Sequence, residues 1–115
     1  MSNHRSRVTT HVLDATLGRP AAGVATRLEQ RALSDWLRVA DGVTDGDGRI
    51  GDFGPVDLDP GVYRVTFDTQ TYFRDTGQTG FYPEVTISFT ISSGDEHYHV
   101  PLLLSPYAYS TYRGS

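Results

Sequence analysis

The C-terminal stretch HYHVPLLLSPYAYSTYRGS, residues 97–115, predicts a hairpin of two β-strands. In its first half apolar side chains recur at every second position, and this period is typical of a strand with one buried face. His97 and His99 then share the other face. A Ser-Pro pair at 105–106 supplies a turn, after which a run rich in tyrosine and threonine continues in extended form. Such a hairpin can bring His99 close to Tyr112.

The same alternation recurs in shorter segments and predicts an all-β fold. Besides the terminal hairpin, we expect strands that begin at Arg49 or lie within 8–13, 24–29, 36–40, 62–67 and 84–92. Residues 68–79 lose the alternation, so we expect one short helix near 72–76, capped by Thr69 or Thr71 and stopped by Gly77. About eight short strands with turns between them indicate an antiparallel β-sandwich.

The length and composition predict a single soluble domain. With 115 residues, the chain is too short to form two separate cores. It has no apolar run near the ~20 residues that a membrane-spanning helix requires. Residues 1–7 lack the apolar segment of a secretory signal. We therefore expect a flexible N-terminal leader at 1–7, one domain at 8–115 and a cytoplasmic location.

The net charge argues against a nucleic-acid partner, and the cysteine content excludes chemistry that requires a thiol. Fourteen acidic residues against ten basic ones give a formal net charge of -4, which argues against nucleic acid as a partner. The chain also has no cysteine. Disulfides, thiolate metal sites and cysteine nucleophiles are therefore unavailable.

The acidic, glycine-rich segment 41–48 resembles a calcium-binding loop only in its composition. When Gly48 is aligned with the invariant glycine of such a loop, Val43 and Gly54 fall at positions that require oxygen ligands. We interpret the segment as a tight turn that places Arg49 at the start of a strand.

Several polar side chains that the alternation places outside the core could carry out acid–base chemistry. They are His11, His97, His99 and Tyr112, with Arg49 at a strand start. Imidazole, with an ordinary pKa of about 6.5, is suited to moving protons at neutral pH. Arginine can stabilise charge that develops on an oxygen atom. The same pattern is also typical of solvated histidines and of an arginine that neutralises nearby aspartates, so the residues alone leave both interpretations open.

Three motifs make the chain similar to the 5-hydroxyisourate hydrolase family of transthyretin-like proteins. They are THVLDATLGRPAAGV at 10–24, TDGDGRI at 44–50 and the closing YRGS at 112–115. The resemblance implies a transthyretin-like antiparallel sandwich of eight strands with one short helix. It also implies hydrolysis of 5-hydroxyisourate to 2-oxo-4-hydroxy-4-carboxy-5-ureidoimidazoline in urate breakdown, with water activated by histidine and no cofactor.

The family's functional residues can be carried over within these motifs. The positions that match its catalytic residues are His11, Arg49 and His99, and those that match the tail closing its substrate pocket are Tyr112, Arg113, Gly114 and Ser115. His97 belongs to the same HYH triplet but does not match a catalytic position. The resemblance further implies a small-molecule substrate and a homotetramer built as a dimer of dimers.

Three alternatives remain. His97 and His99 share a strand face, and His11 could join them as imidazole ligands of a catalytic zinc ion. The chain could instead be a small-molecule carrier of the transthyretin type, although the carrier relatives lack this set of histidines, the arginine and the YRGS tail. A purely structural sandwich would require none of these residues.

Overall fold

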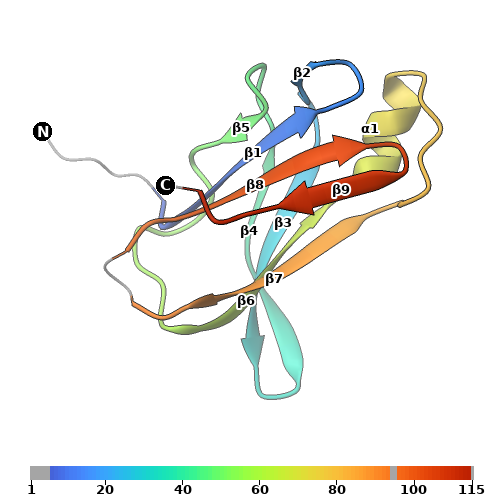
Figure 1. Ribbon diagram of the computed structural model, residues 1–115. Helices are drawn as coiled ribbons and strands as arrows, with labels where there is room; N and C mark the ends of the chain where they lie inside the picture. The colour runs from blue at the N-terminus through green and yellow to red at the C-terminus, as the bar shows by residue number, and fades with distance from the viewer. Residues whose placement is uncertain (1–5, 94–95, 115) are drawn as a thin grey trace, which may run out of the picture.

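The computed structural model describes residues 6–93 and 96–114 of the chain. Within them, nine strands and one short helix form two β-sheets packed face to face (Figure 1). In chain order the elements are β1 (Val8–Asp14), β2 (Arg19–Pro20), β3 (Ala25–Ala32), β4 (Asp35–Val43), β5 (Arg49–Ile50), β6 (Gly61–Phe67), α1 (Thr69–Asp75), β7 (Val85–Ile91), β8 (Tyr98–Ser105) and β9 (Ala108–Thr111). The predicted all-β sandwich with one helix is confirmed.

The first sheet has the strand order β2-β1-β8-β9, with β5 also paired to β1, and the second has the order β4-β3-β6-β7. All strand pairs in these sheets are antiparallel except that of β1 with β8, which is parallel. Parallel neighbours require a long crossover connection, and here the whole second sheet lies between β1 and β8 in the sequence. Alternation within a strand does not reveal its partner, so this parallel pair was not predicted.

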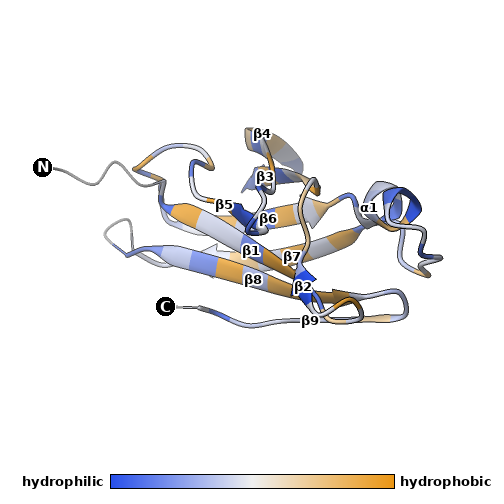
Figure 2. Cartoon of the chain, turned by 90° about the horizontal axis from the view of Figure 1, so that it is seen from above, coloured by the Kyte–Doolittle hydropathy of each residue, from blue (hydrophilic) through white to orange (hydrophobic). Residues whose placement is uncertain are grey.

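The hydrophobic core lies between the two sheets. Its fully buried side chains come from both sheets and include Val12, Leu28, Val65 and Leu102. Full burial of such a side chain contributes roughly 1.5–3 kcal/mol relative to exposure. Figure 2 shows the result along β1 and β8, where hydrophobic and hydrophilic residues alternate. The other face of the first sheet is therefore left for polar side chains.

Helix α1 begins three residues before the predicted segment. Its N-cap is Asp68, whose carboxylate accepts a hydrogen bond from the Thr71 backbone N–H at 3.2 Å. The expectation that Thr69 or Thr71 caps the helix is therefore wrong, since a carboxylate one residue earlier satisfies the free N–H. Gly77, with φ +72°, follows the helix end as predicted. No helix in the described part of the chain is long and apolar enough to cross a membrane.

The ordered domain extends further toward the N-terminus than the expected boundary at Val8. Ser6 is 2% exposed, and its Oγ accepts a hydrogen bond from the Phe53 backbone N–H at 2.9 Å. The Arg7 backbone N–H donates to the Pro55 carbonyl at 2.9 Å. Residues 6 and 7 thus pack against the domain, while the remaining residues of the expected leader, 1–5, lie outside the described residues.

Candidate active site

The outer face of the first sheet carries the predicted catalytic residues. The even-numbered residues of β1 face the core, so Thr9 and His11 project from the other face. The register pairs Thr9 with His99 of β8 and His11 with Arg49 of β5. Directly paired residues of neighbouring strands share a face. Three strands that are distant in sequence therefore bring His11, Arg49 and His99 to one surface.

A tight turn places Arg49 beside β1. Gly48 has φ +77°, and a Cβ atom there would collide with the backbone of β1. The Asp45 carboxylate accepts hydrogen bonds from the backbone N–H groups of Arg49 at 3.0 Å and Asp47 at 2.9 Å. These bonds, with the nearby charges of Arg49 and His11, lower the pKa of Asp45 below its ordinary value. The turn predicted from the sequence is confirmed, and its carboxylate remains ionised near the site.

His11 is held by the same turn. Its Nε2 lies 2.9 Å from the carbonyl oxygen of Asp47. Because a carbonyl oxygen can only accept a hydrogen bond, Nε2 carries the proton in this contact. In the neutral ring the basic nitrogen is then Nδ1, which is the atom of His11 that could take a proton from water.

A buried hydroxyl connects His99 of β8 with His97, which directly precedes this strand. Thr9 is 3% exposed, and its Oγ1 lies 2.8 Å from His99 Nδ1 and 3.0 Å from His97 Nε2. The two imidazole rings are stacked, with centroids 6.4 Å apart and an interplanar angle of 20°. The sequence analysis missed Thr9, which reads as an ordinary strand residue until the β1–β8 register is known.

The tail pairs with the strand that carries His99. The Gly114 backbone N–H donates to the His99 carbonyl oxygen at 2.9 Å, and the two residues form an isolated antiparallel bridge. A Cβ atom at Gly114 would lie 2.5 Å from the His99 ring, so only glycine fits without displacing the imidazole. Tyr112, two residues earlier, is 58% exposed. Ser115 was also predicted to bind substrate and lies outside the described residues.

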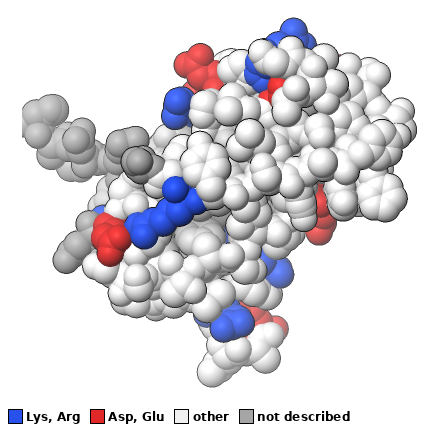
Figure 3. Space-filling view, in the orientation of Figure 1, with Lys and Arg blue, Asp and Glu red and all other residues white. Residues whose placement is uncertain are grey.

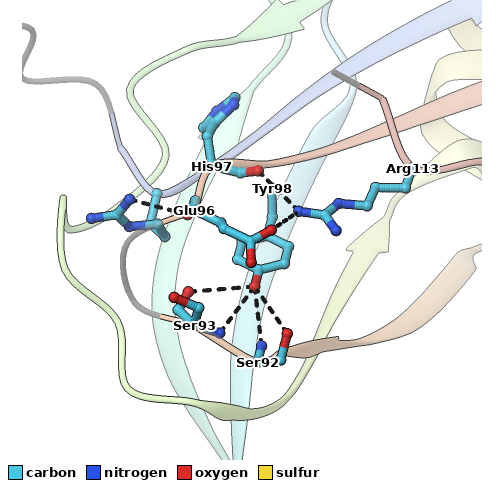
Figure 4. A network of polar contacts seen from close by, with 7 residues as sticks. Ser92, Ser93, Glu96, His97, Tyr98 and Arg113 are labelled. Atoms are coloured by element: carbon cyan, nitrogen blue, oxygen red, sulfur yellow. Dashed lines mark hydrogen bonds and ion pairs between the residues drawn. The ribbon is translucent and has the colours of Figure 1, made fainter.

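Arg113 reaches toward Glu96 and Tyr98 (Figure 4). Its Nη2 lies 2.8 Å from the Glu96 carboxylate, and its guanidinium carbon lies 4.5 Å from the ring centroid of Tyr98. The hydrogen bond from Arg113 to Glu96 raises the pKa of the arginine. Its Nη2 also lies 3.5 Å from the His97 carbonyl oxygen. Arg113 therefore holds the tail to the start of β8 and does not stand beside His11 and Arg49.

A cavity of about 270 Å³ lies between the tail and β7. Its lining includes His99, Tyr112 and Arg113, together with apolar side chains of β7 such as Phe89. His11 and Arg49 do not line it. Larger hollows, of about 770 and 590 Å³, lie over the second sheet and beside α1, and neither is lined by a predicted site residue. A single chain thus brings the predicted catalytic residues to one face without enclosing them in one pocket.

The zinc alternative receives no geometric support. Across residues 6–93 and 96–114, no group of three or more histidine, aspartate or glutamate side chains is arranged to hold a metal ion. The imidazoles of His97 and His99 instead point ring nitrogens at the Thr9 hydroxyl.

Comparisons with known proteins agree with the fold and the motifs. A protein from Mus musculus described as 5-hydroxyisourate hydrolase is 43% identical over 118 residues, which cover 100% of both chains. The solved structure of Klebsiella pneumoniae 5-hydroxyisourate hydrolase is 36% identical, with a TM-score of 0.83, covering 94% of this chain and 98% of that one. Transthyretin from Sparus aurata is 35% identical, with a TM-score of 0.88, covering 96% and 97%. The model of the HIUase/Transthyretin family matches residues 8–114, and the chain therefore belongs to this family.

Proposed function

We propose that the protein hydrolyses 5-hydroxyisourate to 2-oxo-4-hydroxy-4-carboxy-5-ureidoimidazoline, a step of urate breakdown. The observation that carries this proposal is the common outer face of His11, Arg49 and His99, with the tail paired to His99. The similarity to the mouse and Klebsiella proteins described as 5-hydroxyisourate hydrolase supports the same substrate.

The reaction opens a cyclic amide, and each residue has a distinct part in it. His11 or His99 takes a proton from water as the water oxygen bonds to the amide carbonyl carbon. Arg49 stabilises the negative charge that develops on the carbonyl oxygen. The C–N bond then breaks, and the proton passes to the leaving nitrogen. A positioned base supplies ~10² to 10⁴ in rate, and one well-placed donor to the oxyanion ~10² to 10³.

The tail completes the binding site in this proposal. Tyr112 and Gly114 lie beside His99, and Ser115 follows them directly in the sequence. Tyr112 and Gly114 form one wall of the substrate pocket. Arg113 contributes by anchoring the tail through Glu96 and Tyr98.

We further propose that the active form is a homotetramer, a dimer of dimers. A sandwich covers only the inner faces of its sheets, so the catalytic face of one chain stands open to water. Leu13 and Leu103 are only half-buried on that face, and the side turned to the viewer in Figure 3 is mostly neither acidic nor basic. A two-fold partner would turn this face into an enclosed channel with weaker dielectric screening.

A transthyretin-like small-molecule carrier is the second candidate, and the TM-score of 0.88 to the Sparus aurata transthyretin favours it. One assay separates the two. 5-Hydroxyisourate is generated in situ with urate oxidase, and its absorbance decay is followed with and without the protein. The hydrolase accelerates the decay over the spontaneous rate, whereas a carrier binds the compound and leaves the decay unaccelerated.

A further inference from the structure

The geometry points to Thr9 as a positioning residue that orients His99 and links its protonation to that of His97. The kinetic consequence of this inference rests on the proposed function, but its structural consequence does not. Both hydrogen bonds of the Thr9 hydroxyl recorded in the described residues go to these rings, at 2.8 Å and 3.0 Å. The 3% exposure of Thr9 keeps water from replacing either bond.

A hydroxyl carries one proton and two lone pairs. Thr9 can therefore donate to one imidazole only and must accept a hydrogen bond from the other. When Thr9 donates to His97 Nε2, His99 Nδ1 carries a proton and donates to Thr9. The basic nitrogen of the neutral His99 ring is then Nε2, on the side of the ring away from Thr9. The hydrogen bond at one nitrogen thus sets the chemical role of the other.

The same chain of bonds can move a proton during turnover. After His99 Nε2 takes a proton from the attacking water, the ring is a cation with protons on both nitrogens. Its Nδ1 proton passes to the Thr9 oxygen as the Thr9 hydroxyl proton passes to His97 Nε2. His97 becomes the cation, and His99 is again neutral, with the water-derived proton on Nε2. As that proton passes to the leaving nitrogen of the substrate, the relay reverses. His97 Nε2 returns a proton to the Thr9 oxygen and the Thr9 proton returns to His99 Nδ1, so both rings end neutral, as they began.

The surrounding charges favour a single shared proton over two. The charged side chains recorded next to the pair are Arg113, whose Nη2 lies 3.5 Å from the His97 carbonyl oxygen, and Glu96, while His11, Arg49 and Tyr112 come from β1, β5 and the tail of the same sheet. Arg113 is paired with Glu96 and Arg7 with Asp57, so the like charge that matters most for one protonated imidazole is the other ring, whose centroid is 6.4 Å away. Like charges nearby disfavour a second protonation. During turnover the two rings therefore hold no more than one positive charge, and His97 acquires a role that its place outside the family's catalytic positions does not suggest.

Two substitutions at Thr9 separate the hydroxyl from the shape of the side chain. Thr9→Val removes the hydroxyl at nearly constant volume, and Thr9→Ser keeps it. Thr26→Val is the matched control, because Thr26 is 4% exposed and lies in the other sheet, with its Oγ1 bonded to the Val24 carbonyl at 3.1 Å. Thermal unfolding followed by circular dichroism checks that each variant is folded.

The first readout requires no turnover. Long-range ¹H–¹⁵N spectra of the imidazoles report which nitrogen of each ring is protonated. Both His99 and His97 should carry their proton on Nδ1 in three proteins, namely the wild type, Thr9→Ser and Thr26→Val. In Thr9→Val the His99 tautomer should become mixed. Unchanged tautomers in folded Thr9→Val would overturn the inference whether or not the protein is a hydrolase.

The second readout is the pH profile of kcat/KM for 5-hydroxyisourate. Thr9→Val should lower kcat by about tenfold, with little change in KM. This loss is a part of the ~10² to 10⁴-fold rate acceleration that a positioned base supplies. Loss of the hydroxyl removes an acceptor from protonated His99 and lowers its pKa, so the acid limb should move to lower pH. Thr9→Ser should restore both values. Combining Thr9→Val with His97→Asn should cost no more than Thr9→Val alone, because both break the same chain.

The two readouts distinguish a failure of the proposed hydrolase function from a failure of the coupling between His97 and His99 through Thr9. A wild-type protein that does not accelerate decay, while its imidazole tautomers depend on Thr9, contradicts the hydrolase and leaves the coupling standing. An active protein whose Thr9→Val variant keeps the wild-type pH profile and kcat contradicts the coupling and leaves the hydrolase standing.

Discussion

In β1 and β8 of the first sheet, even-numbered side chains face the hydrophobic core and odd-numbered side chains face outward, where the predicted catalytic residues lie. Val12 and Leu102 face inward and are fully buried, whereas His11 and His99 face outward and are only partly buried. Removing a core side chain of this size costs roughly 2–5 kcal/mol. Substitutions on the outward positions should therefore change turnover far more than stability.

His11→Asn and Arg49→Ala are each expected to lower kcat/KM for 5-hydroxyisourate by about 10²-fold, through loss of a base and of an oxyanion donor respectively. Arg49 is exposed and His11 half-buried, so the melting temperature should stay close to that of the wild type. Arg38→Ala, at an exposed position in β4 of the other sheet, is the control and should keep full turnover. A large fall in melting temperature with unchanged turnover would assign these side chains to structure.

Among the elements, the C-terminal tail is attached to β8 and the residues just before it by a few polar contacts. The Gly114 pairing with His99 and the Arg113–Glu96 ion pair are its main described anchors. Both lie outside the hydrophobic core, so the tail can be altered without unfolding the sandwich. This attachment explains how chain-terminal residues, which ordinarily fray, can form part of a site.

Deletion of residues 112–115 is expected to abolish hydrolysis and to leave a folded sandwich, since the buried faces of β7 and β8 remain.

A second test reverses the charges of the Arg113–Glu96 ion pair. Glu96→Arg and Arg113→Glu should each lower turnover, and the double variant should recover part of it. Steady-state kinetics and circular dichroism measure both effects. Full activity in the truncated protein would show that the tail is not part of the pocket.

Helix α1 is tied to β1 by a buried carboxylate. Asp14 is 1% exposed and accepts hydrogen bonds from the Tyr72 hydroxyl at 2.7 Å, the Gln78 side chain and the backbone N–H groups of Thr16 and Leu17. Burial raises the pKa of Asp14, but these hydrogen bonds lower it by more, so the net shift is downward. Asp14 is therefore ionised in the folded protein and acts as a common acceptor for three segments.

Tyr72→Phe is expected to lower the free energy of unfolding at pH 7 by about 1.5–3 kcal/mol, the value of a hydrogen bond to a charged group. Because the folded pKa of Asp14 lies below its unfolded value of about 3.9, this contribution is present above that pH and is lost as pH falls through the folded pKa. Urea unfolding at pH 7 and in acid measures the difference. Tyr107→Phe is the control, because Tyr107 is 69% exposed. An equal loss for both variants would contradict the buried bond.

At the scale of the whole molecule, the sequence predicted what depends on local pattern and missed what depends on distant partners. The alternation in residues 97–104 predicted that His97 and His99 share a face, and both rings do lie beside Thr9. The glycine turn before Arg49 was confirmed. Neither pattern could show that Thr9 lies beside His99, because that contact joins residues 90 positions apart. The partner of Arg113 was missed for the same reason, since Glu96 meets it only after the tail folds back.

The proposed tetramer would cover the face that carries the predicted catalytic residues. Leu103→Glu puts a charge on that face and is expected to weaken the tetramer and lower turnover together. Light scattering at several protein concentrations, with turnover measured at the same concentrations, checks this. Leu37→Glu, at a 54% exposed position on the second sheet, should leave both unchanged. A stable monomer or dimer with full turnover would show that the pocket is complete in fewer subunits.

In the proposed function, the outer face of β1, β5 and β8 hydrolyses 5-hydroxyisourate. The most direct test is the rate of 5-hydroxyisourate decay, generated in situ, with equal concentrations of wild-type protein and His99→Asn. Wild-type protein should accelerate decay well above the spontaneous rate, and folded His99→Asn should retain about one hundredth or less of that acceleration. Equal rates for the two proteins, or no acceleration by the wild type, would contradict the claim.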